Sequence, residues 1–309
     1  MNLTSGQYRL IIWSTVVAAS SYLVIIFLNE WKDIFNALSQ IGFLGLSIAL
    51  LLSLVNYLLR FVRWEMYLQS MNCTMPLLLN LRIYIAGFAL TATPGKSGEM
   101  IRSLLLKPHG IRLSKSLSAF LSERLSDILA ILILALFGLT TYPKTQFISI
   151  VGLVTVLVFL FVMSNNFFLG YLDSKINKKP NQLLFIRRIF NFLVQVQACH
   201  KPLLLLKATL LSLFAWAAES FALYTILTFL SVDLDISFVI FVYAISMLAG
   251  AISLMPGGLG AAEVVMISIL IWKGVGQPEA IASTLIIRLT TLWFAVGLGV
   301  ISLSLLKNN

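Results

Sequence analysis

The sequence predicts an all-α polytopic membrane protein with about six full transmembrane helices and two inverted re-entrant helical hairpins. Three observations predict this class: an apolar composition, a series of long apolar runs, and two Pro-Gly interruptions within such runs. Of the 309 residues, 59% are apolar and only 11% are charged, whereas soluble domains have about 25% charged residues. A membrane-spanning helix uses roughly 20 apolar residues. The composition therefore supports several spans and argues against a soluble domain.

The charge and cysteine content exclude other classes. A formal net charge of +10 fits nucleic-acid binding in a soluble protein, but in a membrane protein basic residues set topology and contact anionic lipid. We therefore expect no nucleic-acid partner. The two cysteines, Cys73 and Cys199, form neither a disulfide framework nor a metal cluster. Because the chain also has no Walker sequence and no metal-ligand spacing, we expect no metal, no cofactor and no catalytic residue.

Nine apolar runs follow one another along the chain. The first is interpreted as an anchor and first span, because a polar segment follows it in place of a small-residue cleavage site. The runs are Leu10–Leu28, Ile41–Leu59, Leu77–Thr93, Ser116–Leu139, Phe147–Met163, Pro202–Leu230, Ile236–Met255, Gly260–Trp272 and Ala280–Leu306.

Two of these runs end at a proline followed by glycines. The interrupted segments are Thr93–Glu99 and Met255–Glu263. The apolar stretches that follow, Met100–Leu106 and Val264–Trp272, are too short to cross a hydrocarbon core of roughly 30 Å. We therefore predict two re-entrant hairpins. A helix break at membrane depth is tolerated where it faces protein or a wet cavity, so we expect both breaks to be buried and to line a cavity.

The domain organisation follows from these runs. We expect one integral membrane domain formed by residues 1–309. Its expected parts are a first half of residues 1–163 with a hairpin near 77–106, a cytoplasmic amphipathic linker of residues 164–201, and a second half of residues 202–309 with a hairpin near 236–273.

Basic residues predict the orientation. If each hairpin returns to its starting side, six full spans remain, and with the N-terminus cytoplasmic fourteen basic residues lie inside and three outside. This asymmetry satisfies the positive-inside rule, so we expect a multi-pass protein of the cell inner or plasma membrane with both termini cytoplasmic. The inside residues are Arg9, Arg60, Arg63, Lys107, Arg112, Lys115, Lys175, Lys178, Lys179, Arg187, Arg188, Lys201, Lys207 and Lys307, and the outside residues are Lys32, Lys144 and Lys273.

The two interrupted segments resemble each other. Pro-Gly-x-x-Gly occurs in both, a glutamate follows (Glu99 or Glu263), and an Arg-Leu pair beginning at Arg124 or Arg288 comes 25 residues after that glutamate. The predicted topology gives the two copies opposite orientations. Broken helices in inverted halves are the sequence pointer to a transporter site near the midplane of the membrane.

Ten charged residues lie at apparent membrane depth. A single charge there costs about 2.5 to 3.5 kcal/mol, so the ten are either paired, as ion pairs that lock helices together, or hydrated in a site. They are Glu99, Glu123, Asp127, Glu219, Glu263, Arg82, Lys96, Arg102, Arg124 and Arg288.

Two acidic features need partners. Glu123 and Asp127 are four residues apart on one helix face, where like charges repel, so that face is expected to meet a cation such as Arg288, Arg102 or Lys96. Glu219, near Trp216, either lines a cavity or makes a hydrogen bond between helices, and the sequence favours neither alternative.

The functional interpretation is a pocket for a phosphate-bearing headgroup. Exposed amides after Pro94 and Pro256 are expected to form anion sites, and arginines to supply bidentate phosphate contacts. Glu99 and Glu263 balance the arginines in the empty pocket or take a proton. The candidate substrate-binding residues are Pro94, Gly95, Lys96, Gly98, Glu99, Arg102, Glu123, Arg124, Asp127, Pro256, Gly257, Gly258, Gly260, Glu263 and Arg288.

These motifs resemble the lysylphosphatidylglycerol synthase transmembrane-region family, the flippase module of the multiple peptide resistance factor, which also occurs as stand-alone proteins. The resemblance covers nearly the whole chain and implies movement of a phospholipid or glycolipid between leaflets. No lysyl-transfer domain follows Leu306, so lipid aminoacylation is not expected. The motifs are Pro94-Gly95-x-x-Gly98-Glu99-x-x-Arg102, Ser122-Glu123-Arg124-Leu125-x-Asp127, and Pro256-Gly257-Gly258-Leu259-Gly260-x-x-Glu263 followed by Arg288.

Three functions remain open at this point. The first is a lipid flippase, which is not an enzyme and has membrane lipids with anionic or phosphate-bearing headgroups as partners. The second is a glycosyl- or lipid-transferring enzyme that uses a polyprenyl-phosphate donor, with Asp233 and Asp235 as its acidic pair. The third is a non-transporting scaffold for a lipid-modifying enzyme or glycosyltransferase.

Overall fold

The computed structural model describes residues 31–93, 97–140 and 201–307, together with positions 147, 150–155, 158 and 199. In this part of the chain the regular structure is helical, as the sequence predicts. The first apolar run, most of the run 147–163 and nearly all of the linker 164–201 lie outside the described residues. Within the described residues, three helical segments are long and apolar enough to cross a bilayer: Ile34–Ser70, Pro202–Phe229 and Gln277–Leu306.

Helix α2 (Trp31–Ser70) is longer than the apolar run that predicts it. Its backbone is interrupted at Gly42, where φ is 63° and ψ is −176°, a conformation that glycine adopts without steric cost. The C-terminal half of α2 has a polar stripe at helical spacing, formed by Ser53, Asn56, Arg60 and Arg63, and all four side chains are buried. This face of α2 therefore points into the protein.

The first interrupted segment folds back on itself. It consists of α3 (Leu77–Gly87), the short 3₁₀ helices η1 (Phe88–Leu90) and η2 (Ser97–Met100), and α4 (Ile101–Leu106). Pro94, Gly95 and Lys96 lie outside the described residues. α4 packs against α3 and against the long helix α5 (Leu113–Leu139), which follows the short 3₁₀ helix η3 (Lys107–His109).

The second interrupted segment has the same form. α9 (Pro202–Phe229) leads into α10 (Ile236–Ile252), the chain breaks over 253–260, and α11 (Ala261–Trp272) packs against α10. The last helix begins with α12 (Gln277–Arg288), passes through a π-helical turn at Leu289–Trp293 and ends with α13 (Phe294–Lys307). Both predicted breaks are therefore present as helix interruptions.

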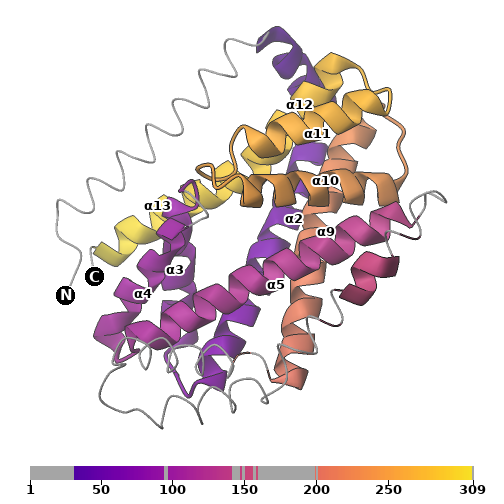
Figure 1. The fold of residues 1–309 in the computed structure, drawn as a ribbon. Coiled ribbons are helices and arrows are strands. Elements are labelled where there is room, and N and C mark those ends of the chain that lie inside the picture. The colour runs from indigo at the N-terminus through magenta and orange to yellow at the C-terminus, as the bar shows by residue number, and fades with distance from the viewer. Residues whose placement is uncertain are drawn as a thin grey trace.

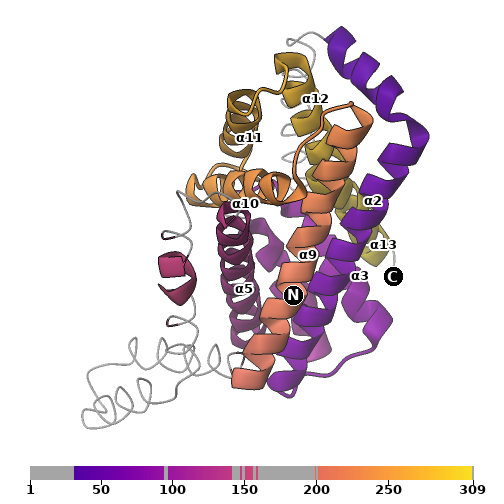
Figure 2. The ribbon, with the colours of Figure 1, turned by 90° about the vertical axis from the view of Figure 1, so that its right-hand side faces the viewer.

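The two halves interlock around α2 and α9, which run side by side in opposite directions (Figures 1 and 2). The Asn56 side-chain amide donates a 2.8 Å hydrogen bond to the carbonyl oxygen of Ala215, 159 positions away. The same separation relates the helix boundaries of the two halves. α9 ends 159 positions after α2, and α10 begins 159 positions after α3. Around this central pair, α5 packs against α10 of the other half, and α13 packs against α3.

One of the two large buried clusters is rich in aromatic side chains, most of them from the first half of the chain. Tyr57, Trp64, Tyr67, Tyr84 and Phe88 share one buried cluster, with neighbouring ring centroids 5.2 to 5.9 Å apart. Large apolar side chains also cover the outer surface, as expected where helices face lipid rather than water. The apolar helices therefore support a membrane location.

Candidate functional site

A group of seven charged side chains fills the interior of the first half, and we call it the first-half cluster. Its members come from α2, η2, α4 and α5, so four elements that are separate in sequence meet at one place. All are buried except one, which is 17% exposed. The members are Arg60, Arg63, Glu99, Arg102, Glu123, Arg124 and Asp127.

Arg63 holds the two like charges of α5 together. Its guanidinium lies 2.7 Å from the Asp127 carboxylate and 3.6 Å from Glu123, and it also donates to the Ser212 hydroxyl on α9. The repulsion expected between Glu123 and Asp127 is thereby compensated. Arg63 itself is 0% exposed.

Arg102 is enclosed by carboxylates and aromatic rings. It lies 3.0 Å from both Glu99 and Glu123, and its guanidinium carbon is 4.6 Å from the Trp64 ring centroid and 4.5 Å from that of Tyr84. Cation–π contacts of this kind stabilise a desolvated guanidinium. With 1% exposure, Arg102 ties α4 to α2, α3 and α5.

Arg124 occupies the edge of the cluster. Its guanidinium lies 3.4 Å from Glu99 and 3.3 Å from Asp127. Arg60 approaches the same two carboxylates at 3.8 and 3.9 Å. Since Arg124 is the partly exposed member of the cluster, it is the one positioned to meet a ligand.

The expected position of two basic residues, Arg60 and Arg63, is wrong. The charge pattern of the sequence places Arg60 and Arg63 at a cytoplasmic flank, but they are 5% and 0% exposed inside the protein. Arg82, expected among the charges at membrane depth, lies on α3 with an exposed side chain. The polar stripe of α2 is the sequence signal that identifies Arg60 and Arg63 as interior residues.

Two arginines face the acidic side of α5 most closely, and only one of them, Arg102, was among the expected partners. Arg102 does contact Glu123, but the main partner is Arg63, which the sequence pattern did not single out. Arg288 pairs with Glu263 in the other half. Lys96 lies outside the described residues.

A smaller pair, Glu263 with Arg288, stabilises the second helix break. Arg288 Nε lies 2.7 Å from Glu263 Oε1, and Arg288 Nη2 donates to the Gly257 carbonyl oxygen at 2.7 Å. The other carboxylate oxygen of Glu263 accepts the Gly260 amide at 2.6 Å, which caps α11. One guanidinium therefore binds both the glutamate and the broken backbone.

The amides of this break do not form the open anion site expected after Pro256. The Gly257 amide donates to the Thr93 carbonyl oxygen in the first break at 3.3 Å, and those of Gly258 and Leu259 donate to carbonyls within the turn at 2.9 and 3.0 Å. With Gly260 also bound to Glu263, these four consecutive amides are therefore already bound to protein acceptors.

The Glu–Arg pairs of the two halves match. Arg124 lies 3.4 Å from Glu99 and Arg288 lies 2.7 Å from Glu263, and in both cases the partners are 25 positions apart. In each half the glutamate follows the helix break and the arginine comes from the next long helix. The matched sequence spacing thus corresponds to a matched contact.

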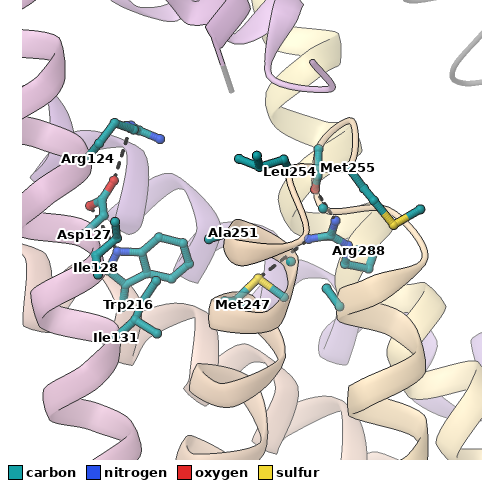
Figure 3. Close-up of a pocket in the computed structure, with 14 residues that line it drawn as sticks. Arg124, Asp127, Ile128, Ile131, Trp216, Met247, Ala251, Leu254, Met255 and Arg288 are labelled. Carbon is teal, nitrogen blue, oxygen red and sulfur yellow. Dashed lines mark hydrogen bonds and ion pairs between the residues drawn. The ribbon is translucent and has the colours of Figure 1, made fainter. Parts of the chain in front are cut away.

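One cavity of about 260 Å³ lies between these two pairs. Arg124 and Asp127 stand at one end and Arg288 at the other, with Trp216 and Met247 between them (Figure 3). The Trp216 indole donates to Asp127 at 3.1 Å. The lining residues are Arg124, Asp127, Ile128, Ile131, Trp216, Met247, Gly250, Ala251, Leu254, Met255, Gly257, Gly258, Ala262 and Arg288.

The candidate residues therefore divide into two groups. Those that line the cavity are Arg124, Asp127, Gly257, Gly258 and Arg288. The remaining described ones hold the surrounding structure through ion pairs, caps or the turn itself; they are Gly98, Glu99, Arg102, Glu123, Pro256, Gly260 and Glu263.

Glu219 has both of the roles considered for it. Its carboxylate accepts a 2.6 Å hydrogen bond from the Tyr243 hydroxyl on α10, so it joins two helices. It also lines a second, smaller cavity of about 30 Å³, which shares Trp216, Met247 and Arg288 with the larger one.

Comparisons with known proteins agree with this architecture. The model of a family described as the lysylphosphatidylglycerol synthase TM region matches residues 11–299. The chain is 30% identical over 230 residues to the UPF0104 membrane protein MJ1078 of Methanocaldococcus jannaschii, a match that covers 72% of this chain and 95% of that protein. A UPF0104 membrane protein of Methanothermobacter thermautotrophicus is 27% identical over 305 residues, covering 92% of this chain and 90% of that protein.

Proposed function

This chain belongs to the lysylphosphatidylglycerol synthase transmembrane-region family, and we propose that it is a lipid flippase, which moves a phosphate-bearing phospholipid or glycolipid between leaflets. A membrane role related to lipid fits both the family and the apolar helices. The headgroup is proposed to cross through the 260 Å³ cavity, while the acyl chains remain in the surrounding lipid. The chain is proposed to act as a transporter and not as an enzyme.

The observation that carries this proposal is the placement of Arg124 and Arg288 on one cavity. The two arginines come from α5 and α12, one from each half of the chain. A guanidinium binds phosphate through two parallel hydrogen bonds, so two of them at opposite ends suit a headgroup phosphate. The rest of the wall is mostly apolar, as in typical ligand sites.

We also propose that the two halves are inverted structural repeats. Three observations support this proposal: the antiparallel contact of α2 with α9, the repeated order of elements and the matched Glu–Arg pairs. Transporters with such repeats bind substrate where the broken helices meet and expose it to each side in turn. The contact between Thr93 and Gly257 brings the two breaks together at this cavity.

The proposed topology has six full spans, with the two interrupted segments entering from opposite faces as re-entrant hairpins. Both termini are placed on the cytoplasmic side of the cell membrane. With Arg60 and Arg63 counted as interior residues, twelve basic residues remain inside against three outside. The positive-inside asymmetry survives this correction.

The test is a transport assay with the full chain purified and reconstituted into liposomes that contain a fluorescent phospholipid. Movement of the label between leaflets, faster than in protein-free liposomes, is the expected result. Formation of a new lipid product would support the polyprenyl-phosphate enzyme instead, with Asp233 and Asp235 in the exposed loop between α9 and α10 as its acidic pair. Neither movement nor product would support a scaffold for a separate lipid-modifying enzyme or glycosyltransferase.

A further inference from the structure

The larger and the smaller cavity are lined by equivalent positions of the two halves. Before the helix breaks, the separation of 159 positions that joins Asn56 to Ala215 relates three residues of the smaller cavity to three of the larger one. These equivalent pairs are Tyr57 and Trp216, Phe88 and Met247, and Thr91 and Gly250. Each cavity therefore lies between a central helix and the segment that leads into a helix break.

The same relationship continues after the breaks. The separation there is 164 positions, as it is between Glu99 and Glu263, so Arg288 of the smaller cavity is the equivalent of Arg124 of the larger one. Three further pairs follow one and two helical turns later: Asp127 and Thr291, Ile128 and Leu292, and Ile131 and Ala295. Seven residues of the smaller cavity thus have a counterpart in the larger one.

Contacts at the two cavities follow the same equivalence. At the larger cavity, the Trp216 indole donates to the Asp127 carboxylate at 3.1 Å. At the smaller one, the Tyr57 hydroxyl donates to the carbonyl oxygen of Thr291, and these residues are the equivalents of the first two. The helices also correspond, because α5 packs against α10 at one cavity and α13 packs against α3 at the other. The two cavities are therefore built in the same way.

The cavities differ in size and in exposure. The larger has a volume of about 260 Å³ and the smaller of about 30 Å³, which is room for roughly two water molecules. Ile128 in the wall of the larger cavity is 40% exposed, whereas its equivalent Leu292 is 5% exposed. The rings of Tyr57 and Phe88 pack with their centroids 5.2 Å apart beside the smaller cavity. The structure thus has one cavity open and its counterpart closed.

The smaller cavity has the donors of an anion site. Two arginines and one carboxylate line each cavity: Arg60, Arg288 and Glu219 the smaller, and Arg124, Arg288 and Asp127 the larger. Arg60 is 5% exposed, and its Nε and Nη2 atoms have no hydrogen-bond partner among the residues that the structure describes. Its carboxylate neighbours lie 3.8 and 3.9 Å away. Because buried donors without acceptors are unfavourable, Arg60 favours an anionic ligand in this cavity.

We propose that the smaller cavity is a second headgroup site, which opens to the opposite face of the membrane when the larger cavity closes. Two inverted halves with equivalent walls have two conformations of similar free energy, each with one cavity open. Arg288 lines both cavities, so it stays with the phosphate while Arg60 takes the place of Arg124. This inference rests on the proposed function and adds the path of the headgroup between the two leaflets.

The first experiment compares equivalent positions by cysteine labelling. Ile128→Cys and Leu292→Cys are made in the full chain and exposed, in membrane vesicles of each sidedness, to a small membrane-impermeant thiol reagent. We expect the two cysteines to react from opposite faces, because an irreversible reaction collects even rare openings of the smaller cavity. Ile286→Cys, buried on α12 and absent from both cavity walls, is the matched control and stays unreactive. Ile131→Cys and Ala295→Cys form a second equivalent pair in case Leu292→Cys does not fold.

Three results would overturn the second site. They are reaction of both equivalent cysteines from the same face, no reaction of Leu292→Cys and Ala295→Cys from either face, and reaction of Ile286→Cys as fast as that of Leu292→Cys. The last result would mean that the helix loosens as a whole, and not that a cavity opens.

The second experiment identifies the ligand. Dioctanoyl phosphatidylglycerol is expected to slow the labelling of Ile128→Cys and Leu292→Cys several-fold, because its phosphate occupies both cavities in turn. Dioctanoylglycerol, which lacks the phosphate, is expected to have little effect. Equal protection by dioctanoylglycerol, or protection by inorganic phosphate and not by the phospholipid, would overturn the assignment of a lipid headgroup.

The liposome transport assay separates this inference from the proposed function. Labelling of Ile128→Cys and Leu292→Cys from opposite faces without any lipid movement would overturn the flippase but keep the second site. Lipid movement by Leu292→Cys and Ala295→Cys proteins whose cysteines never react would keep the flippase and overturn the second site.

Discussion

The backbone amide of Gly257 donates a hydrogen bond to the carbonyl oxygen of Thr93 at 3.3 Å. These residues belong to the two helix breaks, which are far apart in sequence but adjacent at the cavity. Gly257 has a φ of +62°, and a Cβ atom at this position would lie 3.2 Å from Ala92 Cα. Both the backbone conformation and the close approach therefore require glycine here.

Gly257→Ala is expected to destabilise the protein. The left-handed conformation alone costs a residue with a Cβ about 1 to 2 kcal/mol, and the contact with Ala92 adds to this. Gly110→Ala is the matched control, because Gly110 has a φ of +81° with open space around it. Thermal unfolding in mild detergent should show the larger loss for Gly257→Ala. Equal losses would mean that the contact between the breaks contributes little to stability.

Arg124→Lys is expected to impair transport with near-normal folding. Lysine keeps the positive charge near Glu99 and Asp127 but loses the planar fork that binds phosphate. Loss of one charge-assisted hydrogen bond of about 1.5 to 3 kcal/mol corresponds to roughly a 10- to 100-fold lower rate. Translocation per folded molecule is measured in liposomes, with the exposed Arg82→Lys as control. An unchanged rate would remove Arg124 from the headgroup site.

Arg288→Lys is the informative contrast to Arg124→Lys. The Arg288 guanidinium binds Glu263 and the Gly257 carbonyl at the same time, and an ammonium group cannot reproduce this fork. We therefore expect this variant to lose both folded yield and transport. A variant with normal yield and normal transport per folded molecule would contradict the assignment of Arg288 to the site.

Arg102→Met is expected to destabilise the protein without a specific transport defect. Removal of one partner from a buried ion pair costs about 3 to 5 kcal/mol, and here both Glu99 and Glu123 lose a contact at 3.0 Å. Arg112→Met, at an exposed position, controls for the change in residue type. Unfolding temperature and transport per folded molecule are the two measurements. A normal unfolding temperature with lost transport would reverse the assignment and make Arg102 a headgroup ligand.

Cysteine accessibility tests the proposed topology. A cysteine introduced at position 144 should react with a membrane-impermeant maleimide from outside, and one at position 178 from the cytoplasmic side. Labelling with the opposite sidedness at either position would be incompatible with six spans and cytoplasmic termini. Both positions lie outside the described residues, so the experiment is independent of the structure.

The native cysteines are expected to stay silent in that assay. Cys73 and Cys199 are both buried. Burial raises the pKa of the Cys199 thiol to about 11 and also raises the pKa of Cys73. Because the thiolate is the reactive form, the fraction that reacts at neutral pH is small. The unmodified chain therefore serves as the background control.

The helix breaks and the Glu–Arg spacing were predictable from sequence because their signals are local. Proline and glycine interrupt a helix wherever it packs, and α4 and α11 end at Leu106 and Trp272 as predicted. The interior role of Arg60 and Arg63 was not predicted. Near the end of an apolar run, an arginine that flanks a membrane and one that faces α5 look alike unless the polar residues one and two turns earlier, Asn56 and Ser53, are also taken into account.

The role of Arg102 depends still more on tertiary structure. Its aromatic neighbour Trp64 is distant in sequence, so no spacing rule connects them. The same is true of the Trp216 indole and Asp127, which lie 89 positions apart. Which predicted arginine reaches the cavity and which is sealed in the core follows from how α2, α3, α4 and α5 pack.

The π-helical turn at Leu289–Trp293 fixes the rotational phase of the last helix. Each residue advances an α-helix by about 100°, and a π turn accommodates an additional residue. Beyond it, Ser302 donates to the Arg82 carbonyl oxygen at 2.8 Å, and Gly299 packs against the backbone of Ala89. Deletion of a single residue from the turn would rotate both contacts away from the first half while Arg288 stayed at the cavity. This stretch therefore tolerates substitution of side chains far better than a change in its length.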